Sequence, residues 1–155
     1  MLGCGANVSI PMMERTKMTD YAALLKESGL KATFQRMNIL EVIEKHGHMS
    51  VDDIYAEVIK VHPSLSLATI YKNIILMQEN GILVEVPIAG KKSKYELAKI
   101  DHMHLICTEC GEVEDMNCMT STDKIFHELT EKEHFKLDRR QVNLYGVCGS
   151  CQSDV

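Results

Sequence analysis

The sequence predicts an α+β protein built from an N-terminal winged helix-turn-helix unit and a smaller C-terminal unit of strands around one helix. Two observations carry this prediction. Four helical segments with capping residues precede a strand–turn–strand pattern in the first half, and two Cys-x-x-Cys pairs bracket strand-like segments in the second. We expect an N-terminal extension over residues 1–18, the winged helix over 19–92 and the second unit over 93–155.

The first two helices are predicted from their capping residues. Thr19 can cap a helix over residues 20–28, and Thr33 can cap another over 34–46. A threonine hydroxyl at this position accepts a hydrogen bond from a free backbone N–H group of the first turn. A glycine follows each segment, which is typical of a helix C-terminus.

The third helix has the clearest signal at its start. Ser50 and Asp53 have the spacing of a capping box, and apolar residues recur from Val51 onward at helical spacing. A His-Pro dipeptide at residues 62–63 should end this helix, because the residue before a proline avoids the helical backbone conformation.

The fourth helix is predicted to start after Ser66 and to run up to Gly81. Four apolar residues would form its core stripe: Leu67, Ile70, Ile74 and Met77. The opposite face is small and polar with one cation, and Tyr71 lies at its edge; it carries Ala68, Thr69, Lys72 and Asn73.

Strand patterns over residues 82–87 and 92–97 flank a turn at 89–92 that carries basic residues. Helices followed by a hairpin give the order of a winged helix, in which the last helix enters a DNA major groove and the hairpin tip lies on phosphates. The same order fits a small helical bundle with a hairpin and no ligand, so the pattern alone leaves DNA binding open.

The C-terminal part changes character. Residues 102–107 and 112–116 resemble two strands around a turn, 121–133 a helix, and 139–148 a returning strand, which together predict a β-β-α-β unit.

The two halves of the chain also differ in charge. Up to Lys94 there are 11 Lys and Arg against 10 Asp and Glu (+1), and from Tyr95 onward 6 against 12 (−6), which together give the net −5. Near-neutrality of the first half does not by itself indicate nucleic-acid binding.

The two Cys-x-x-Cys pairs predict a structural zinc site. Two residues between cysteines let one tight turn direct both sulfurs at one ion, and four thiolates close a tetrahedral Zn²⁺ site with no position left for catalysis. Two unrelated pairs or a redox dithiol are the alternatives. The four residues are Cys107, Cys110, Cys148 and Cys151.

A second metal site is predicted beside the first pair. His102 and His104 are two apart on a predicted strand, so both imidazoles face the same side. Glu96 and Asp115 lie on neighbouring strand segments, and His48 precedes the third helix. Three imidazoles and two carboxylates would suit Fe²⁺, Mn²⁺ or Zn²⁺. Spacing alone does not show that His48 reaches the other four. The alternative is that His102 and His104 belong to a half-buried polar strand face that binds no metal.

Composition excludes some classes of protein. No apolar run approaches the about 18–20 residues of a membrane span, and the N-terminus lacks the features of a secretory signal. We therefore expect a cytoplasmic protein with no membrane partner. Paired cysteines in such a chain are more typical of zinc ligands than of disulfides.

Several stretches, in order and with familiar spacings, resemble the ferric uptake regulator family between Tyr21 and Cys151: LKATFQR, HMSVDDIY, SLATIYKNI, NGIL, HMHLICTECGEVEDM and YGVCGSC. The resemblance implies a homodimeric transcriptional repressor that binds double-stranded operator DNA. It also implies that the second unit is a dimerisation domain with an α/β fold, and that the protein is not an enzyme.

The resemblance also assigns the metal ligands. The four cysteines match the structural zinc ligands, and the regulatory Fe²⁺ or Mn²⁺ ligands are matched by His48, Glu96, His102, His104 and Asp115. It implies that one ion joins His48, from the DNA-binding half, to four ligands from the C-terminal half, and so fixes the spacing of two winged helices on DNA.

Asp115 favours the peroxide-sensing branch, in which Fe²⁺ and peroxide would oxidise His48 or His102, because iron-sensing members carry glutamate there. Glu96 departs from that branch, which usually has aspartate at this position. Met103 stands where many iron sensors have an aspartate ligand, so an additional metal site is not expected. An iron or zinc uptake repressor on the same scaffold is the alternative.

The resemblance directs the DNA contacts to the fourth helix and its surroundings. The candidates there are Arg36, Ser66, Thr69, Tyr71, Lys72 and Asn73, with Lys91 or Lys92 on the wing as phosphate contacts. A zinc hydrolase is disfavoured, because the sequence has no His-Glu-x-x-His helix. No role is assigned to Cys4, Cys118, His127 or His134.

Overall fold

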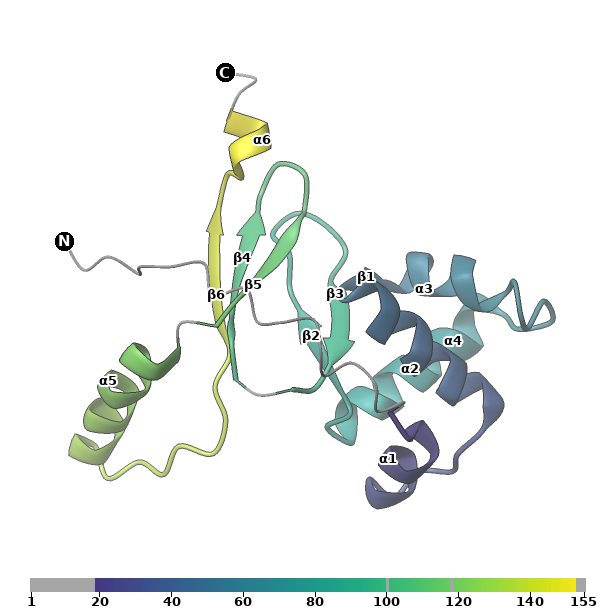
Figure 1. The fold of residues 1–155 in the computed structure, drawn as a ribbon, viewed down its shortest axis with the longest axis horizontal. Coiled ribbons are helices and arrows are strands. Elements are labelled where there is room, and N and C mark those ends of the chain that lie inside the picture. The colour runs from purple at the N-terminus through teal and green to yellow at the C-terminus, as the bar shows by residue number, and fades with distance from the viewer. Residues whose placement is uncertain (1–18, 100, 118, 153–155) are drawn as a thin grey trace.

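In the computed structural model of the chain, residues 19–99, 101–117 and 119–152 are described, and they form two three-stranded sheets with separate helices. The predicted extension over 1–18, with Cys4, and the residue Cys118 lie outside this part. Figure 1 shows helices α1–α4 grouped on one side, the second sheet in the middle and α5 on the far side. Among the described residues, no helix has both the length and the apolar character needed to span a membrane.

The helices predicted in the first half are all present: α1 (Tyr21–Glu27), α2 (Phe34–His46), α3 (Val51–Val58) and α4 (Leu67–Glu79). Thr33 caps α2 as predicted, and Ser66 caps α4. The capping box of α3 is complete, since the Ser50 and Asp53 side chains each accept the other residue's backbone N–H. These local signals are sufficient to fix where the three helices begin.

Three details of the helix prediction were wrong. Asp20 caps α1 in place of Thr19, whose hydroxyl instead donates to Glu44 at 2.7 Å. Helix α3 ends at Val58, because the chain tightens into turns between residues 59 and 62, before the proline is reached. Leu67 is 42% exposed, since it lies in the first turn at the edge of the apolar stripe of α4, whereas the other three stripe residues are fully buried.

The first sheet has the strand order β1-β3-β2, with β1 (Met49–Ser50), β2 (Leu83–Val86) and β3 (Lys94–Leu97) all antiparallel. Strands β2 and β3 are the predicted hairpin. Strand β1, which the sequence did not predict, is only two residues long and pairs with the far edge of β3. The predicted domain division between residues 92 and 93 stays a prediction, and β3, which follows it, pairs within this first sheet.

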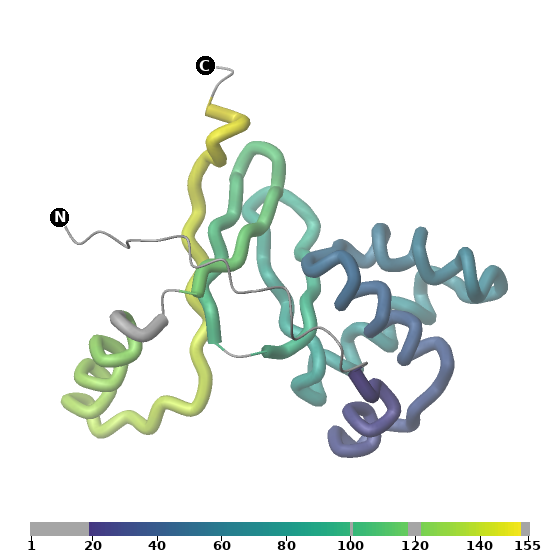
Figure 2. The backbone as a smooth tube through the Cα atoms, in the orientation of Figure 1, coloured from purple at the N-terminus to yellow at the C-terminus, as the bar shows by residue number. Residues whose placement is uncertain are grey.

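The second sheet is the predicted β-β-α-β unit, with the strand order β5-β4-β6. Strands β4 (Met103–Cys107) and β5 (Val113–Met116) form an antiparallel hairpin. After α5 (Met119–Lys132), strand β6 (Val142–Gly146) returns parallel to β4, and an unpredicted short helix, α6 (Gly149–Gln152), follows. Figure 2 shows the connection after α5 running back to the start of β6.

A small apolar cluster joins the two sheets. Val86, at the end of β2, and Ile88, two residues beyond it, pack with Ile106 and Val113 of the second sheet, and all are buried. Two hydrogen bonds reinforce the contact: the Gln141 side chain donates to the Glu85 carbonyl at 2.8 Å, and the Tyr145 hydroxyl donates to the Pro87 carbonyl at 2.9 Å. The main core is separate and lies among α1–α4 and the first sheet.

Candidate metal centres

Strand pairing places His48 beside Glu96. His48 directly precedes β1, and Met49 pairs with Tyr95, the residue before Glu96 on β3. The imidazole Nε2 of His48 lies 3.1 Å from Glu96 Oε2, and the side chains are only 11% and 3% exposed. The non-local pairing of a two-residue strand therefore brings together residues that are 48 positions apart in the sequence (96 − 48).

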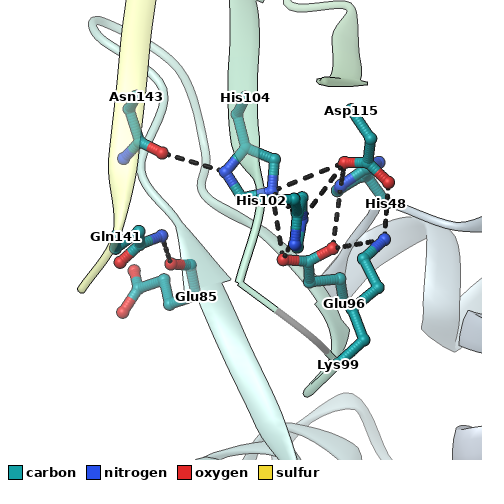
Figure 3. A network of polar contacts seen from close by, with 9 residues as sticks. All are labelled: His48, Glu85, Glu96, Lys99, His102, His104, Asp115, Gln141 and Asn143. Atoms are coloured by element: carbon teal, nitrogen blue, oxygen red, sulfur yellow. Dashed lines mark hydrogen bonds and ion pairs between the residues drawn. The ribbon is translucent and has the colours of Figure 1, made fainter. Parts of the chain in front are cut away.

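The second sheet supplies the other three members of the group. His104 on β4 pairs in register with Asp115 on β5. His102, just before β4, faces the same side as His104, as the spacing predicted, and their Nε2 atoms lie 2.9 Å apart. All three side chains point to the gap between the sheets, where they meet His48 and Glu96 (Figure 3).

The five side chains converge on one point, and their ligand atoms all lie within 4.8 Å of one another. We name this group the regulatory cluster. Asp115 Oδ1 lies 3.1 Å from the Nε2 of His48 and 3.3 Å from that of His102. Glu96 Oε1 lies 3.2 Å from the Nε2 of His102 and 3.0 Å from that of His104. The structure thus brings together all five residues predicted for the second metal site.

The donors fit a divalent first-row metal ion. Nε2 of His48 and Oε2 of Glu96 are buried and lie close to charged neighbours, but neither atom has a well-directed hydrogen bond among the described residues. Buried polar atoms without well-directed partners are costly, whereas one cation bound between them would satisfy both. Three imidazole nitrogens and two carboxylates form a mixed N/O set of the kind that binds Fe²⁺, Mn²⁺ or Zn²⁺.

The five ligands come from both sheets. The resemblance implied that His48 comes from the DNA-binding half and the other four from the C-terminal half, a division that stays a prediction, and Glu96 lies on β3 of the first sheet. The pairing of β1 with β3 holds His48 and Glu96 together, and the other three come from the second sheet. An ion in the cluster would therefore join two ligands of one sheet to three of the other.

Electrostatics within the cluster favour a charged Glu96 carboxylate and a protonated His104 imidazole when no metal is bound. Burial opposes ionisation of Glu96, but contacts with His104, His48 and Lys99 outweigh it and hold its pKa well below the usual range. Burial likewise opposes protonation of His104, but its contacts with Glu96 and Asn143 raise its pKa. The cluster thus attracts positive charge.

Two residues of this site were missed from the sequence. Asn143 on β6 pairs in register with His104, and its Oδ1 lies 2.9 Å from His104 Nδ1. An amide oxygen can only accept, so this contact keeps a proton on Nδ1 and leaves Nε2 as the nitrogen that can release its proton and bind an ion. Lys99, in the link between the sheets, contacts both Glu96 and Asp115. Finding either residue would have required the register of the second sheet or the path of the link.

A cleft of about 770 Å³ adjoins the regulatory cluster. Its lining includes Glu96, Lys99, His102, His104 and Arg140. The regulatory cluster therefore lies beside a cleft large enough to hold small solutes.

The four cysteines of the Cys-x-x-Cys pairs form a second group, with all sulfurs within 4.8 Å of one another, and none of them is in a disulfide. Sγ of Cys110 lies 3.8 Å from Sγ of Cys148. A tetrahedral Zn²⁺ with Zn–S bonds of about 2.3 Å requires sulfur separations of about 3.8 Å, so the geometry fits zinc. Gly111, at φ +77°, provides the turn that follows the first pair.

The thiols of the cysteine group differ in pKa. Backbone N–H groups of Cys110 and Cys148 point at the Cys107 sulfur and lower its pKa to about 6. The neighbouring sulfurs of Cys148 and Cys110 raise the pKa of Cys151 to about 12. The Cys107 thiol therefore ionises most readily, and a bound divalent cation would be needed to draw the proton from Cys151.

The predicted DNA-contact residues of α4 are differently placed. Tyr71 is 50% exposed and Lys72 is also exposed, whereas Ser66 and Thr69 hydrogen-bond each other at the start of the helix. Asn73 is engaged within the protein, since its Oδ1 accepts from Arg36 Nε at 2.9 Å and its Nδ2 donates to the Thr69 carbonyl. Arg36 and Asn73 thus connect α2 to α4.

The basic residues of the hairpin turn also make contacts within the protein. Lys92 forms an ion pair with Asp52 at the start of α3. The Lys91 stem lies so close to Gly111 that a Cβ there would meet its Cδ at 3.0 Å. His127 and His134 join no group of three or more potential metal ligands among the described residues.

Comparison with known proteins gives consistent results. A profile of the ferric uptake regulator family matches residues 27–145. The ferric uptake regulation protein of Neisseria gonorrhoeae is 34% identical over 134 residues, covering 84% of this chain and 92% of that one. The peroxide operon regulator of Bacillus subtilis is 32% identical over 128 residues, covering 82% and 88%. The crystal structure of the Campylobacter jejuni peroxide stress regulator superimposes with a TM-score of 0.71 at 34% identity, covering 83% and 97%.

Proposed function

This chain belongs to the ferric uptake regulator family, and we propose that it is a peroxide-responsive, metal-dependent repressor of transcription. Members of the family are DNA-binding regulators of transcription and not enzymes. Iron-regulator and peroxide-regulator names both occur among the relatives, so the assignment to the peroxide branch is ours. The regulatory cluster, which spans the two sheets, is the observation that carries the proposal.

The regulatory cluster supports a hinge that an ion closes. In the proposal, Fe²⁺ or Mn²⁺ binds His48 and Glu96 from the first sheet together with His102, His104 and Asp115 from the second. Binding both sheets at once gives the ion a higher affinity for the closed arrangement, and that difference in affinity is what allows metal to control DNA binding.

The cysteine group supports a separate structural role for Zn²⁺. Cys107 and Cys110 belong to the β4–β5 hairpin, whereas Cys148 and Cys151 follow β6. One zinc ion would hold the ends of the second sheet together and leave no open coordination position. In the proposal, this ion stabilises the unit and takes no part in sensing.

Operator binding requires two copies of the chain in the proposal. Helix-turn-helix dimers place their recognition helices in successive major grooves about 34–36 Å apart. The second unit exposes large apolar side chains that pairing with another copy would cover: Ile125, Leu129, Phe135, Leu144, Tyr145 and Val147. Helix α4 would enter the groove, with Tyr71 and Lys72 as its exposed candidates for base or phosphate contact.

The peroxide response is assigned to the imidazole ligands. Bound Fe²⁺ would supply the electron that cleaves the peroxide O–O bond beside the His48 and His102 rings, and the oxidised ring would return that electron to the iron; Mn²⁺ would not react in this way. Overall, one peroxide oxygen is added to a ring carbon and the other leaves as water. An oxidised ring no longer presents Nε2 with its original geometry, so the connection between the sheets is lost and DNA is released.

An iron or zinc uptake repressor with the same scaffold is the second candidate. Glu96 favours it, because the peroxide-sensing branch usually has aspartate at this position. Asp115 favours the peroxide reading, because iron sensors carry glutamate there.

The deciding experiment loads zinc-containing protein with Fe²⁺ without air, binds it to DNA selected from a random double-stranded pool, and adds peroxide. We expect release of the DNA together with a mass increase of one oxygen atom on the peptide containing His48 or His102. The controls are Mn²⁺-loaded protein and Asp115→Glu, both of which should stay on the DNA unmodified. Unmodified Fe²⁺-loaded protein that stays bound would overturn the peroxide assignment and leave the uptake repressor.

A further inference from the structure

We propose that Lys99 is an internal cation that opposes metal binding at the regulatory cluster and so sets the metal concentration at which the sheets are joined. The inference rests on the proposed function, since it concerns how tightly the same site holds its ion. It is suggested by the position of one ammonium group among the ligands.

The Lys99 ammonium bridges the two carboxylates of the cluster. Its Nζ lies 2.5 Å from Asp115 Oδ2 and 3.1 Å from Glu96 Oε2 (Figure 3). Asp115 belongs to the second sheet and Glu96 to the first, and Lys99 lies in the link between them. Without a metal ion, the ammonium therefore connects the same two sheets that the ion would join.

The charges show why this ammonium should weaken metal binding. When an ion is bound, the three imidazoles are neutral and the two carboxylates carry a charge of −2, which one divalent ion would balance. With Lys99 in place the group carries −1, and the same ion leaves it at +1. Glu96 is almost fully buried, so solvent screens the repulsion between ion and ammonium only partly.

Lys99 also occupies ligand atoms. The outer oxygen of Asp115 and one oxygen of Glu96 contact the ammonium, so neither carboxylate can offer both oxygens to an ion while these contacts persist. The Lys99 side chain is 44% exposed, and its flexible stem lets the ammonium withdraw toward solvent when an ion enters. Withdrawal costs both contacts, and that cost weakens the affinity for metal.

The test measures Mn²⁺ affinity in the zinc-loaded full chain from the free Mn²⁺ signal in electron paramagnetic resonance. We compare wild type with Lys99→Met, which keeps the length without the charge, and with Lys99→Arg, which keeps the charge. We expect Lys99→Met to bind Mn²⁺ about tenfold more tightly and Lys99→Arg to resemble wild type. We also expect metal-free Lys99→Met to unfold at a lower temperature than metal-free wild type.

Equal or weaker Mn²⁺ binding by Lys99→Met, repeated in Lys99→Gln, would overturn the inference and leave the proposed function standing. A His104→Ala variant separates the two failures, since it should lose Mn²⁺ binding if the cluster is the site. If wild type does not bind Mn²⁺, or His104→Ala binds it as wild type does, then the proposed function fails and this inference fails with it.

Discussion

Replacing Asn143 with leucine should weaken metal binding without touching any ligand. Leucine has a similar size but no hydrogen-bond acceptor, so the Nδ1 proton of His104 loses the partner that lies 2.9 Å away. His104 is almost completely buried, so water cannot replace the amide. An unpaired buried donor costs about 1–3 kcal/mol, and the ring can then also rotate or exchange its proton to Nε2.

Loss of such an outer partner typically lowers metal affinity about 10–100-fold. This corresponds to about 1.4–2.7 kcal/mol of binding free energy, within the range expected for the lost hydrogen bond. Isothermal Mn²⁺ titration of the zinc-loaded protein measures the effect. Asn143→Asp, which keeps the acceptor, is the matched control and should bind at least as tightly as wild type. Equal Mn²⁺ affinity in Asn143→Leu and wild type would refute the reasoning that this amide fixes the His104 tautomer.

Three further predictions test the fold and the two sites. Ile74→Ala should lower the free energy of unfolding by about 2–5 kcal/mol and Leu67→Ala by less than about 1 kcal/mol, because only Ile74 is fully buried. Urea unfolding measures both losses. Equal losses would contradict the placement of Leu67. Cys110→Ser should abolish zinc retention and accelerate hydrogen exchange in β4–β6 more than in α2–α4. Equal acceleration throughout the chain would argue against a zinc ion that stabilises only the second sheet. Mn²⁺ affinity should fall as pH falls, because protons compete with the ion for His104 Nε2. The decline should begin above pH 6.5, the ordinary pKa of histidine, because the pKa of His104 is raised. An affinity that stays constant from neutral pH down to 6.5 would contradict this.

The elements found from the sequence are those with signals within a few residues. Thr33, Ser50 and Ser66 cap their helices because each hydroxyl acts on the turn that follows it. Thr19 failed as a cap because a better acceptor, Asp20, is adjacent and because Glu44, distant in sequence, accepts its hydroxyl. Neither the two-residue strand β1 nor the short helix α6 is long enough to show a periodic pattern.

The candidate sites also divide into features with a local sequence signal and features that depend on distant contacts. Spacing places the two cysteines of each pair on one tight turn, and the structure shows that the two pairs meet. The regulatory cluster depends on contacts that spacing does not contain. His48 reaches it through the pairing of β1 with β3, and Asn143 through the register of β6 against β4. The sequence also did not show that the strand of Glu96 pairs within the first sheet and not with the strands that follow it.

The central claim is that one ion joins the two sheets through the regulatory cluster. Crystals of the zinc-loaded chain grown with Mn²⁺ test it through an anomalous difference map recorded at the manganese absorption edge. We predict one manganese peak per chain bonded to Nε2 of all three histidines and to both carboxylates: His48, His102, His104, Glu96 and Asp115. A peak elsewhere, or one bonded only to His102, His104 and Asp115 of the second sheet, would contradict the account.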